Sequence, residues 1–470
     1  MHLFKETSPD QLYLLPPSVN EFVAADAPVR ILSEIIDHLD TSSLILRYKG
    51  GGAPAYDPRI LFKLLVFGYS QGMHSSRRLA GACGYDLRFM YLAQMQQPDF
   101  RTVCRFRREN ETTLKALFVQ TVILSQLVGL VLLEHVAIDG TKLEADVSGK
   151  ATYTKERLAR ETAEIDAQVA QLMAKAEATD AGEDAIHHDD DGDQTPGDLK
   201  DKQRRKARLL AAKERLEAAR KSLEGTERAT VALTDSDSRV MKTHGVNRPA
   251  YNAQAAVDGA NHIIVAADIT QDVNDTQQFG PMVNATMENT GFVPAHFTAD
   301  AGYCSPETMA YADTHKVDAY VAERPEYASR AGYRYDTETD CFHGVIEETK
   351  DHVLRFWSNQ KKRGRLYRVY RDAEVGKQRW CREHPSVEAA GQAKMHQKLT
   401  SPEGRAIYRQ RQHVVEPVFG HIKGSINLRR LCLRGLSGAR VEYLLACCAH
   451  NISKITSVWR DSRQFVLKPS

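Results

Sequence analysis

The stretch HVAIDGTKLEA at residues 135–145 begins with a short apolar run that ends in Asp139. A second run of the same kind, AHFTADAGY at residues 295–303, carries Asp300 in the matching place. Short apolar runs bounded by turn residues are typical of buried strands. An Asp at the carboxyl edge of such a strand stands where open α/β sheets place their active sites. A loop-capping role is the alternative for either Asp alone, and the repetition favours a site.

Further strands are predicted around these two. Residues 252–257 and 262–267 are apolar runs on either side of an Asp-Gly pair, which indicates a hairpin. Residues 317–322 predict another strand, and a helix from Pro306 to Thr314 fits between it and residues 295–300. The sequence therefore predicts a mixed α/β core. Asn252 and Asp258, on the hairpin, are expected to be structural.

Residues 1–128 predict a helical N-terminal domain. Apolar residues recur at helical spacing over 31–39 and after Asp57-Pro58, and a third helix contains Leu79. A fourth helix is expected over 101–118, with Asp99 as its N-cap. Residues 116–133 are uncharged, but polar side chains interrupt them and Gly129 is a natural helix stop. We therefore expect a buried helix that ends near Val128 and no membrane span.

Two insertions interrupt the predicted core. In residues 155–228 apolar residues recur at spacings of three, four or seven, which predicts an antiparallel helical hairpin. Its tip, residues 177–201, holds ten acidic residues and one basic residue. Residues 187–198 match a calcium loop poorly, so we interpret the tip as a solvated acidic loop.

Residues 325–398 form the second predicted insertion, which is polar, basic and aromatic. Its aromatic residues could stack on a splayed base or form a small satellite core; they are Phe356, Trp357, Tyr367, Tyr370 and Trp380. Cys381 and His384 are too few for a structural zinc site, which needs four ligands. We therefore expect no zinc.

The overall composition hides an uneven distribution of charge. The 470 residues include 63 Lys and Arg against 61 Asp and Glu, for a net charge of +2. Between residues 405 and 440, however, eight basic residues surround a single acid, Glu416. Such a density of basic residues indicates a surface that binds a polyanion. The eight cysteines form no CxxC pair and the chain begins without a signal peptide, so a cytoplasmic location is expected.

Asp139, Asp300 and Glu416 supply hard oxygen ligands. Carboxylates of this kind suit Mg²⁺ or Mn²⁺. Two such ions about 4 Å apart activate an attacking water or 3′-hydroxyl and stabilise the leaving oxygen of a phosphodiester. The neighbouring Arg and Lys residues would hold the nucleic-acid backbone.

Four blocks of this sequence resemble the DDE transposases of bacterial insertion sequences, in the branch with a helical N-terminal domain and a Tyr-Arg-Glu-Lys signature. The blocks are YDPRILFKLLVFGYSQGMHSSRRLAGACGYDLRFMYLA with PDFRTVCRFR, then IDGTKLEA, then MKTHGVNRPAYNAQAAVD with ADAGYCS, and last YRQRQHVVEPVFGHIK. They occur in the family's order and span nearly the whole chain.

The resemblance implies an RNase H-like mixed-sheet core in which Asp139, Asp300 and Glu416 bind two Mg²⁺ or Mn²⁺ ions. It also implies that Tyr408, Arg411 and Lys423 contact DNA phosphates. The family signature leaves three residues between its Arg and Glu, whereas four separate Arg411 from Glu416, so Arg409 is an alternative. The other basic residues predicted to bind DNA are Arg429 and Arg430 near the Glu helix, and Arg105, Arg107 and Arg108 in the N-terminal domain. For these last three, a solvated helix face is the alternative.

The expected domains are residues 1–128 for the N-terminal domain, and 129–154 with 229–324 and 399–460 for the catalytic core. The insertions are 155–228 and 325–398. The predicted function is a transposase that cleaves double-stranded DNA at element ends and joins it to target DNA. The resemblance also implies that the protein acts on DNA as a homodimer, in the cytoplasm and at the nucleoid of a bacterium. The alternatives are a catalytically silent DNA-binding relative and a structural protein built around the hairpin.

Overall fold

The structure is a computed structural model. It describes residues 18–48, 55–148, 152–186, 196–223, 230–243, 245–322, 333–336, 338–344, 349–362, 365–373, 376–381 and 385–466.

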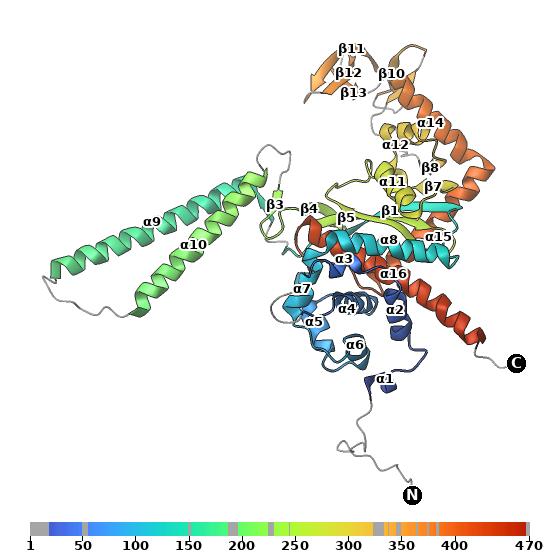
Figure 1. The fold of residues 1–470 in the computed structure, drawn as a ribbon. Helices are drawn as coiled ribbons and strands as arrows, with labels where there is room; N and C mark the ends of the chain where they lie inside the picture. Colours follow the sequence, from blue (N-terminus) through green and yellow to red (C-terminus); the bar gives the residue numbers. More distant parts are fainter. Residues whose placement is uncertain are drawn as a thin grey trace, which may run out of the picture.

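A mixed six-stranded sheet forms the centre of the molecule (Figure 1). Its strands are β1 (His135–Glu144), β4 (Arg239–Thr243), β5 (Val246–Asp258), β6 (Ile264–Thr270), β7 (His296–Ala299) and β8 (Ala319–Val321). The order is β4-β5-β1-β7-β8, and β6 also pairs with β5. The strands β1, β7 and β8 are parallel, whereas β5 is antiparallel to β1, β4 and β6. This sheet confirms the predicted mixed α/β class.

The strand β1 is longer than predicted. It continues past Asp139 through a half-exposed segment to Glu144, and it pairs with β5 over its whole length, from Val136 opposite Asp258 to Glu144 opposite Ala250. The prediction that Asp139 ends a strand before a glycine turn is therefore wrong, because Gly140 is itself a strand residue. By contrast, Asp300 directly follows β7, as predicted, and caps the short 3-10 helix η2 (Ala301–Tyr303).

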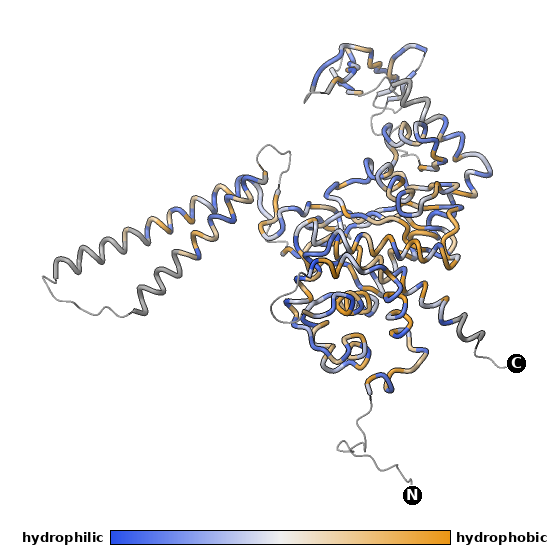
Figure 2. The backbone as a smooth tube through the Cα atoms, viewed as in Figure 1, coloured by the Kyte–Doolittle hydropathy of each residue, from blue (hydrophilic) through white to orange (hydrophobic). Residues whose placement is uncertain are grey.

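Helices cover both faces of the sheet (Figure 1). On one face lie α8 (Glu111–Leu127) and α16 (Gly435–Val466), and on the other lie α11 (Phe279–Thr290) and α12 (Pro306–Thr314). The bounds of α12 and the end of α8 agree with the prediction. Apolar residues concentrate where these layers meet (Figure 2). Within the described residues, no helix is long and apolar enough to cross a membrane.

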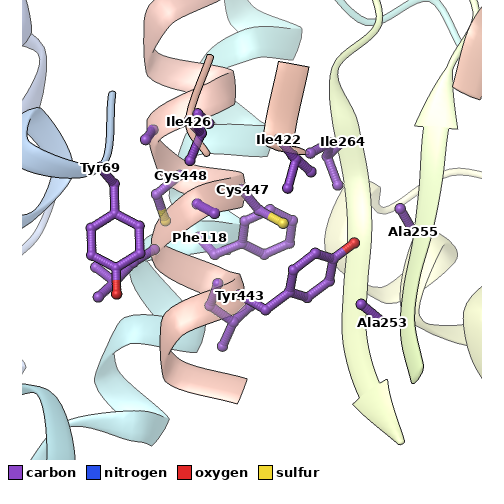
Figure 3. Close-up of a cluster of buried hydrophobic side chains, with 14 of the residues drawn as sticks. Tyr69, Phe118, Ala253, Ala255, Ile264, Ile422, Ile426, Tyr443, Cys447 and Cys448 are labelled. Carbon is purple, nitrogen blue, oxygen red and sulfur yellow. The ribbon is translucent and has the colours of Figure 1, made fainter. Parts of the chain in front are cut away.

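The helix α16 connects the sheet to the N-terminal helices. Figure 3 shows Tyr443 and Cys447 of α16 directed toward the sheet that carries Ala253 and Ala255, while Tyr69 approaches the same helix from the N-terminal region. Tyr69, Tyr443 and Cys447 are completely buried. Because one continuous core joins these elements, the N-terminal helices and the sheet pack as one body.

The N-terminal region is helical, as predicted. Its helices are α1 (Val19–Phe22), α2 (Pro28–Asp37), α3 (Ser42–Ile45), α4 (Pro58–Ser70), α5 (Ser76–Ala82), α6 (Leu87–Leu92) and α7 (Phe100–Glu109). Asp99 caps α7 by accepting a hydrogen bond from the amide of Arg101. The predicted single helix over 101–118 is wrong, because Asn110 leaves the helical conformation and separates α7 from α8.

The first insertion forms a helical hairpin that projects from the core (Figure 1). It consists of β2 (Thr152–Thr154), α9 (Lys155–Ile186), α10 (Pro196–Leu223) and β3 (Thr230–Ala232). At its base Leu158 packs with Leu216 and Leu223, and further out Lys213 forms an ion pair with Asp166 at 2.5 Å. The helices therefore run antiparallel, as predicted. Residues 187–195 at the tip, which hold most of the loop compared with a calcium site, lie outside the described residues.

The second insertion contains an antiparallel sheet that the sequence did not predict. Its strands are β9 (Tyr333–Asp336), β10 (Cys341–Gly344), β11 (Val353–Lys362), β12 (Arg365–Asp372) and β13 (Gln378–Cys381). The buried Tyr370 packs with Phe342 and Leu354 in a satellite core, whereas 58% of Trp357 is exposed. The helices α14 (Pro385–Thr400) and α15 (Pro402–Lys423) lead back to the main sheet. His384 lies outside the described residues.

Candidate active site

Asp139 lies on β1, and Asp300 directly follows the neighbouring parallel strand β7. Ile138 of β1 is paired with Ala299 of β7, so the next residue in each segment is an Asp. The Asp300 carboxylate accepts a hydrogen bond from the amide of Gly302 at 2.7 Å, and the Asp139 carboxylate accepts one from the amide of Gly140 at 2.8 Å. These short local bonds hold both carboxylates at the edge where the parallel pairing of β1 with β7 ends.

The helix α15 lies against this edge and places a cation on Asp139. Nη1 of Arg411 is 3.1 Å from Oδ2 of Asp139, and the side chains are 14% and 21% exposed. Burial raises the pKa of Asp139 to about 6; Arg411 opposes this shift and the negative charge of Asp300 adds to it. Burial also raises the pKa of the half-buried Tyr408, whereas the neighbouring Arg411 lowers it. Arg411 thus faces the acid pair, although the sequence left Arg409 as its rival.

Glu416 lies on a different face of α15. Its side chain is exposed. Arg409 and Lys423 are seven residues before and after it, and seven residues make nearly two helical turns. Arg409 and Lys423 therefore flank Glu416 along one side of the helix. Among the described residues, no three His, Cys, Asp or Glu side chains are close enough to hold a metal ion. The three-acid metal site therefore stays a prediction.

Pro417 interrupts the hydrogen bonding of α15 next to Glu416. A proline has no N–H, so it cannot donate to the carbonyl four residues before it, which is that of His413. Nε2 of His262 lies 3.1 Å from this carbonyl oxygen and donates to it instead. The β5–β6 loop that carries His262 thus stabilises α15 at the position of the predicted catalytic Glu.

Several basic residues near α15 have acidic partners. Arg430 and Arg434 lie 3.3 and 3.1 Å from the Asp146 carboxylate, and Arg440 lies 3.0 Å from Asp268. These three arginines are therefore paired with acids that lie outside residues 405–440. Arg429 is exposed, and its Nε donates to the carbonyl of Lys423 at 2.9 Å.

Arg107 is not a surface residue. Only 2% of its side chain is exposed, and Nη1 lies 3.0 Å from Oε1 of the fully buried Glu442. It also donates to the carbonyl of His74 at 3.0 Å and to Ser76 at 2.6 Å. The prediction that Arg107 contacts DNA is therefore wrong, because every short contact of its guanidinium is made inside the protein.

Arg105 and Arg108 are exposed at a cavity of about 580 Å³ beside α7. Arg77 and Arg101 also line this cavity, and their guanidinium groups lie over the ring of Phe100 at 4.9 and 5.6 Å. Arg107 lines the cavity too, but it is buried. The two predicted residues therefore belong to a group of four exposed arginines, and the sequence did not indicate Arg77 and Arg101 as members of this group.

Asp275 is a further acid near the pair, and no pattern in the sequence pointed to it. It lies in the loop between β6 and α11, where Oδ1 accepts hydrogen bonds from Asn252 and Gln254 of β5 at 2.6 and 2.7 Å. The Asn274-Asp275 pair before an apolar helix reads as an ordinary turn. The approach of β5 to this loop becomes visible only in the fold.

The charges at this edge define the class of protein. Neighbouring carboxylates can hold cations, and exposed arginines can hold a phosphate backbone, so an enzyme that acts on nucleic acid is indicated. Residues 17–109 match a transposase domain (DUF772), and residues 227–452 match the transposase DDE domain. No curated protein matches the chain.

The chain belongs to the DDE transposases of insertion sequences. It is a DNA transposase, an enzyme that cleaves DNA and transfers strands. Enzymes of this family generally use divalent metal ions.

Proposed function

We propose that Asp139, Asp300 and Glu416 form the metal-binding site of this transposase, with two Mg²⁺ or Mn²⁺ ions. The adjacency of Asp139 and Asp300 on parallel strands is the observation that carries this proposal. Their carboxylates are hard ligands, and Arg411 supplies positive charge beside Asp139. Glu416 joins the pair through a shift of α15 or of its own side chain. When bound, the metal lowers the pKa of the attacking hydroxyl and stabilises the leaving oxygen.

The residues of α15 and the segment after it are proposed to hold the DNA strand. Tyr408, Arg409, Lys423, Arg429 and Arg430 would contact phosphates on either side of Glu416. The exposure of Arg409 and Arg429 supports this role, because phosphate contacts need side chains that reach the surface. Arg411, which is already paired with Asp139, would orient that carboxylate and contact the phosphate only at the reacting centre.

The N-terminal helices are proposed to bind the element end. Arg105 and Arg108, with Arg77 and Arg101, present four exposed arginine side chains at one cavity, which Glu109 also lines. Guanidinium groups match phosphate oxygens in pairs of parallel hydrogen bonds. Phosphates of duplex DNA entering this cavity would fix the position of the protein on the element end without reading its sequence.

We also propose the four-part division of the chain given above, a homodimer that joins two element ends, and action in the cytoplasm of a bacterium at its nucleoid. The boundary at residue 398 falls inside α14, so that helix belongs to both the insertion and the core.

Cleavage of element-end DNA with Mg²⁺ tests the proposal. The matched variants are Asp139→Ala, Asp300→Ala and Glu416→Ala, each compared with the wild type for cleavage and for DNA binding in EDTA. Loss of cleavage with retained DNA binding is expected in all three. Retained cleavage in the three variants would contradict the proposal that these residues bind the metal ions. A wild type that binds DNA but never cleaves it would instead indicate a silent relative.

A further inference from the structure

Asp275 receives hydrogen bonds from three side chains of the central sheet. Oδ1 accepts from Nδ2 of Asn252 at 2.6 Å, from Nε2 of Gln254 at 2.7 Å and from Nζ of Lys142 at 3.3 Å. Asn252 and Gln254 are completely buried. Three donors on one oxygen of a half-buried carboxylate hold it firmly in one orientation.

This carboxylate lies close to both segments that carry the acid pair. A methyl group added to Gly140, which follows Asp139, would lie 2.8 Å from Oδ1 of Asp275. A methyl group added to Gly302 would lie 3.4 Å from Oδ2 of Asp275 and 2.7 Å from Oδ1 of Asp300. Asp275 therefore fits between β1 and η2, where glycines leave room for it.

The strand register places this network behind the acid pair. Asp139 is opposite Ala255, and Gly140 is opposite Gln254. Residues directly opposite each other share a face of the sheet, and successive residues alternate. Asp139 therefore points to one face and Gln254 to the other, so the network supports β1 from the reverse side.

A second chain of contacts connects Asp275 to Asp300. The hydroxyl of Tyr303 donates to Oε1 of Gln254, whose Nε2 donates to Asp275. Tyr303 is completely buried and ends the 3-10 helix that Asp300 caps. Burial, and then the charges of Asp275, Asp139 and Asp300, raise the pKa of Tyr303, so its hydroxyl stays protonated and donates.

The chemistry of a carboxylate sets the direction of this chain. A carboxylate only accepts hydrogen bonds, so Gln254 must turn its NH₂ toward Asp275 and its oxygen toward Tyr303. An amide at position 275 could also donate. The NH₂ group of an Asn at position 275 could donate to the oxygen of a flipped Gln254 amide. The NH₂ group of Gln254 would then face the Tyr303 hydroxyl, which would lose its acceptor.

We infer that Asp275 is a positioning residue for the transposase reaction: through Gln254 and Tyr303 it fixes the segment of Asp300, and through Lys142 of β1 it fixes that of Asp139. This inference rests on the proposed metal-binding role of those two acids. Residues that orient the ligands of a metal typically change its affinity by about 10- to 100-fold when they are replaced.

The test compares the full-length wild type with Asp275→Asn. Binding of Mn²⁺ to the DNA-free protein, measured by titration calorimetry, should weaken by about 10- to 100-fold. The Mn²⁺ concentration for half-maximal cleavage should rise by a similar factor, while DNA affinity in EDTA stays unchanged. The control is Asp272→Asn, because Asp272 is exposed and its carboxylate contacts only Gln278 among the described hydrogen bonds.

Tyr303→Phe keeps the charge of the site and breaks the same chain at another position. It should weaken Mn²⁺ binding in the same direction, and the double variant with Asp275→Asn should show less than the sum of the two effects. Wild-type Mn²⁺ affinity in a folded Asp275→Asn or Tyr303→Phe protein would overturn the inference. A wild type that neither binds Mn²⁺ nor cleaves DNA would instead refute the proposed function on which the inference rests.

Discussion

Arg107→Met is predicted to destabilise the protein strongly. The substitution keeps much of the side-chain volume and removes the charge that lies 3.0 Å from Oε1 of Glu442. Glu442 is fully buried, and its remaining partners are the Tyr69 hydroxyl and the amides of Cys432 and Leu433. None of these remaining partners is charged.

The expected loss follows from the burial of both partners. Removing one member of a buried ion pair leaves an uncompensated charge and costs about 3–5 kcal/mol. Glu442→Gln in the Arg107→Met background removes that charge, and its amide oxygen can still accept from a backbone amide. The double variant should therefore be more stable than Arg107→Met alone.

Urea unfolding followed by circular dichroism measures these differences. Arg108→Met is the matched control, because Arg108 is the exposed neighbour on the same helix and should change the free energy of unfolding by no more than about 0.5 kcal/mol. An Arg107→Met protein that is as stable as the control but binds DNA more weakly would show that Arg107 contacts DNA and does not stabilise the protein through Glu442.

Two further predictions concern the surface arginines and a buried histidine. Arg105→Ala and Arg108→Ala should each weaken binding to duplex DNA and lower the magnitude of the slope of log affinity against log salt by about 0.9. Fluorescence anisotropy at several salt concentrations measures this slope. An unchanged slope would show that the two arginines do not contact phosphates. Burial lowers the pKa of His450, which faces His421, Lys454 and the carbonyl of His262, to about 3. Below pH about 6.5 only the unfolded chain takes up this proton. As the pH falls further, the free energy of unfolding of the wild type should therefore decrease by about 1.4 kcal/mol per pH unit relative to that of His450→Gln. The same pH dependence of this free energy in both proteins from pH 8 to 5.5 would contradict the prediction.

The apolar runs and helix signals predicted most of the catalytic core. Residues 135–139 and 295–300 were found because buried strands are continuous apolar segments. The continuation of β1 to Glu144 was missed because its second half is partly exposed and pairs with β5, which comes more than a hundred residues later. Local pattern cannot report such a distant partner.

The sheet of the second insertion was missed for a different reason. The strand β12 contains four charged residues, which favoured a polar insertion, although Tyr367, Val369 and Tyr370 are residue types that are common in strands. The sequence likewise does not show which residue a particular arginine contacts. Arg107 resembles Arg105 and Arg108 in the chain, and only the packing of α7 against α16 turns it toward Glu442.

The role of Glu416 is the central claim, because the other two acids already lie side by side. Single-turnover cleavage of element-end DNA with Mg²⁺ should be compared for Glu416→Gln and Glu403→Gln, since Glu403 is an exposed acid at the start of the same helix. Loss of an oxygen ligand should exceed the effect of a supporting residue, so a fall of more than about 100-fold is expected for Glu416→Gln alone. Equal cleavage rates in the two variants would contradict the account.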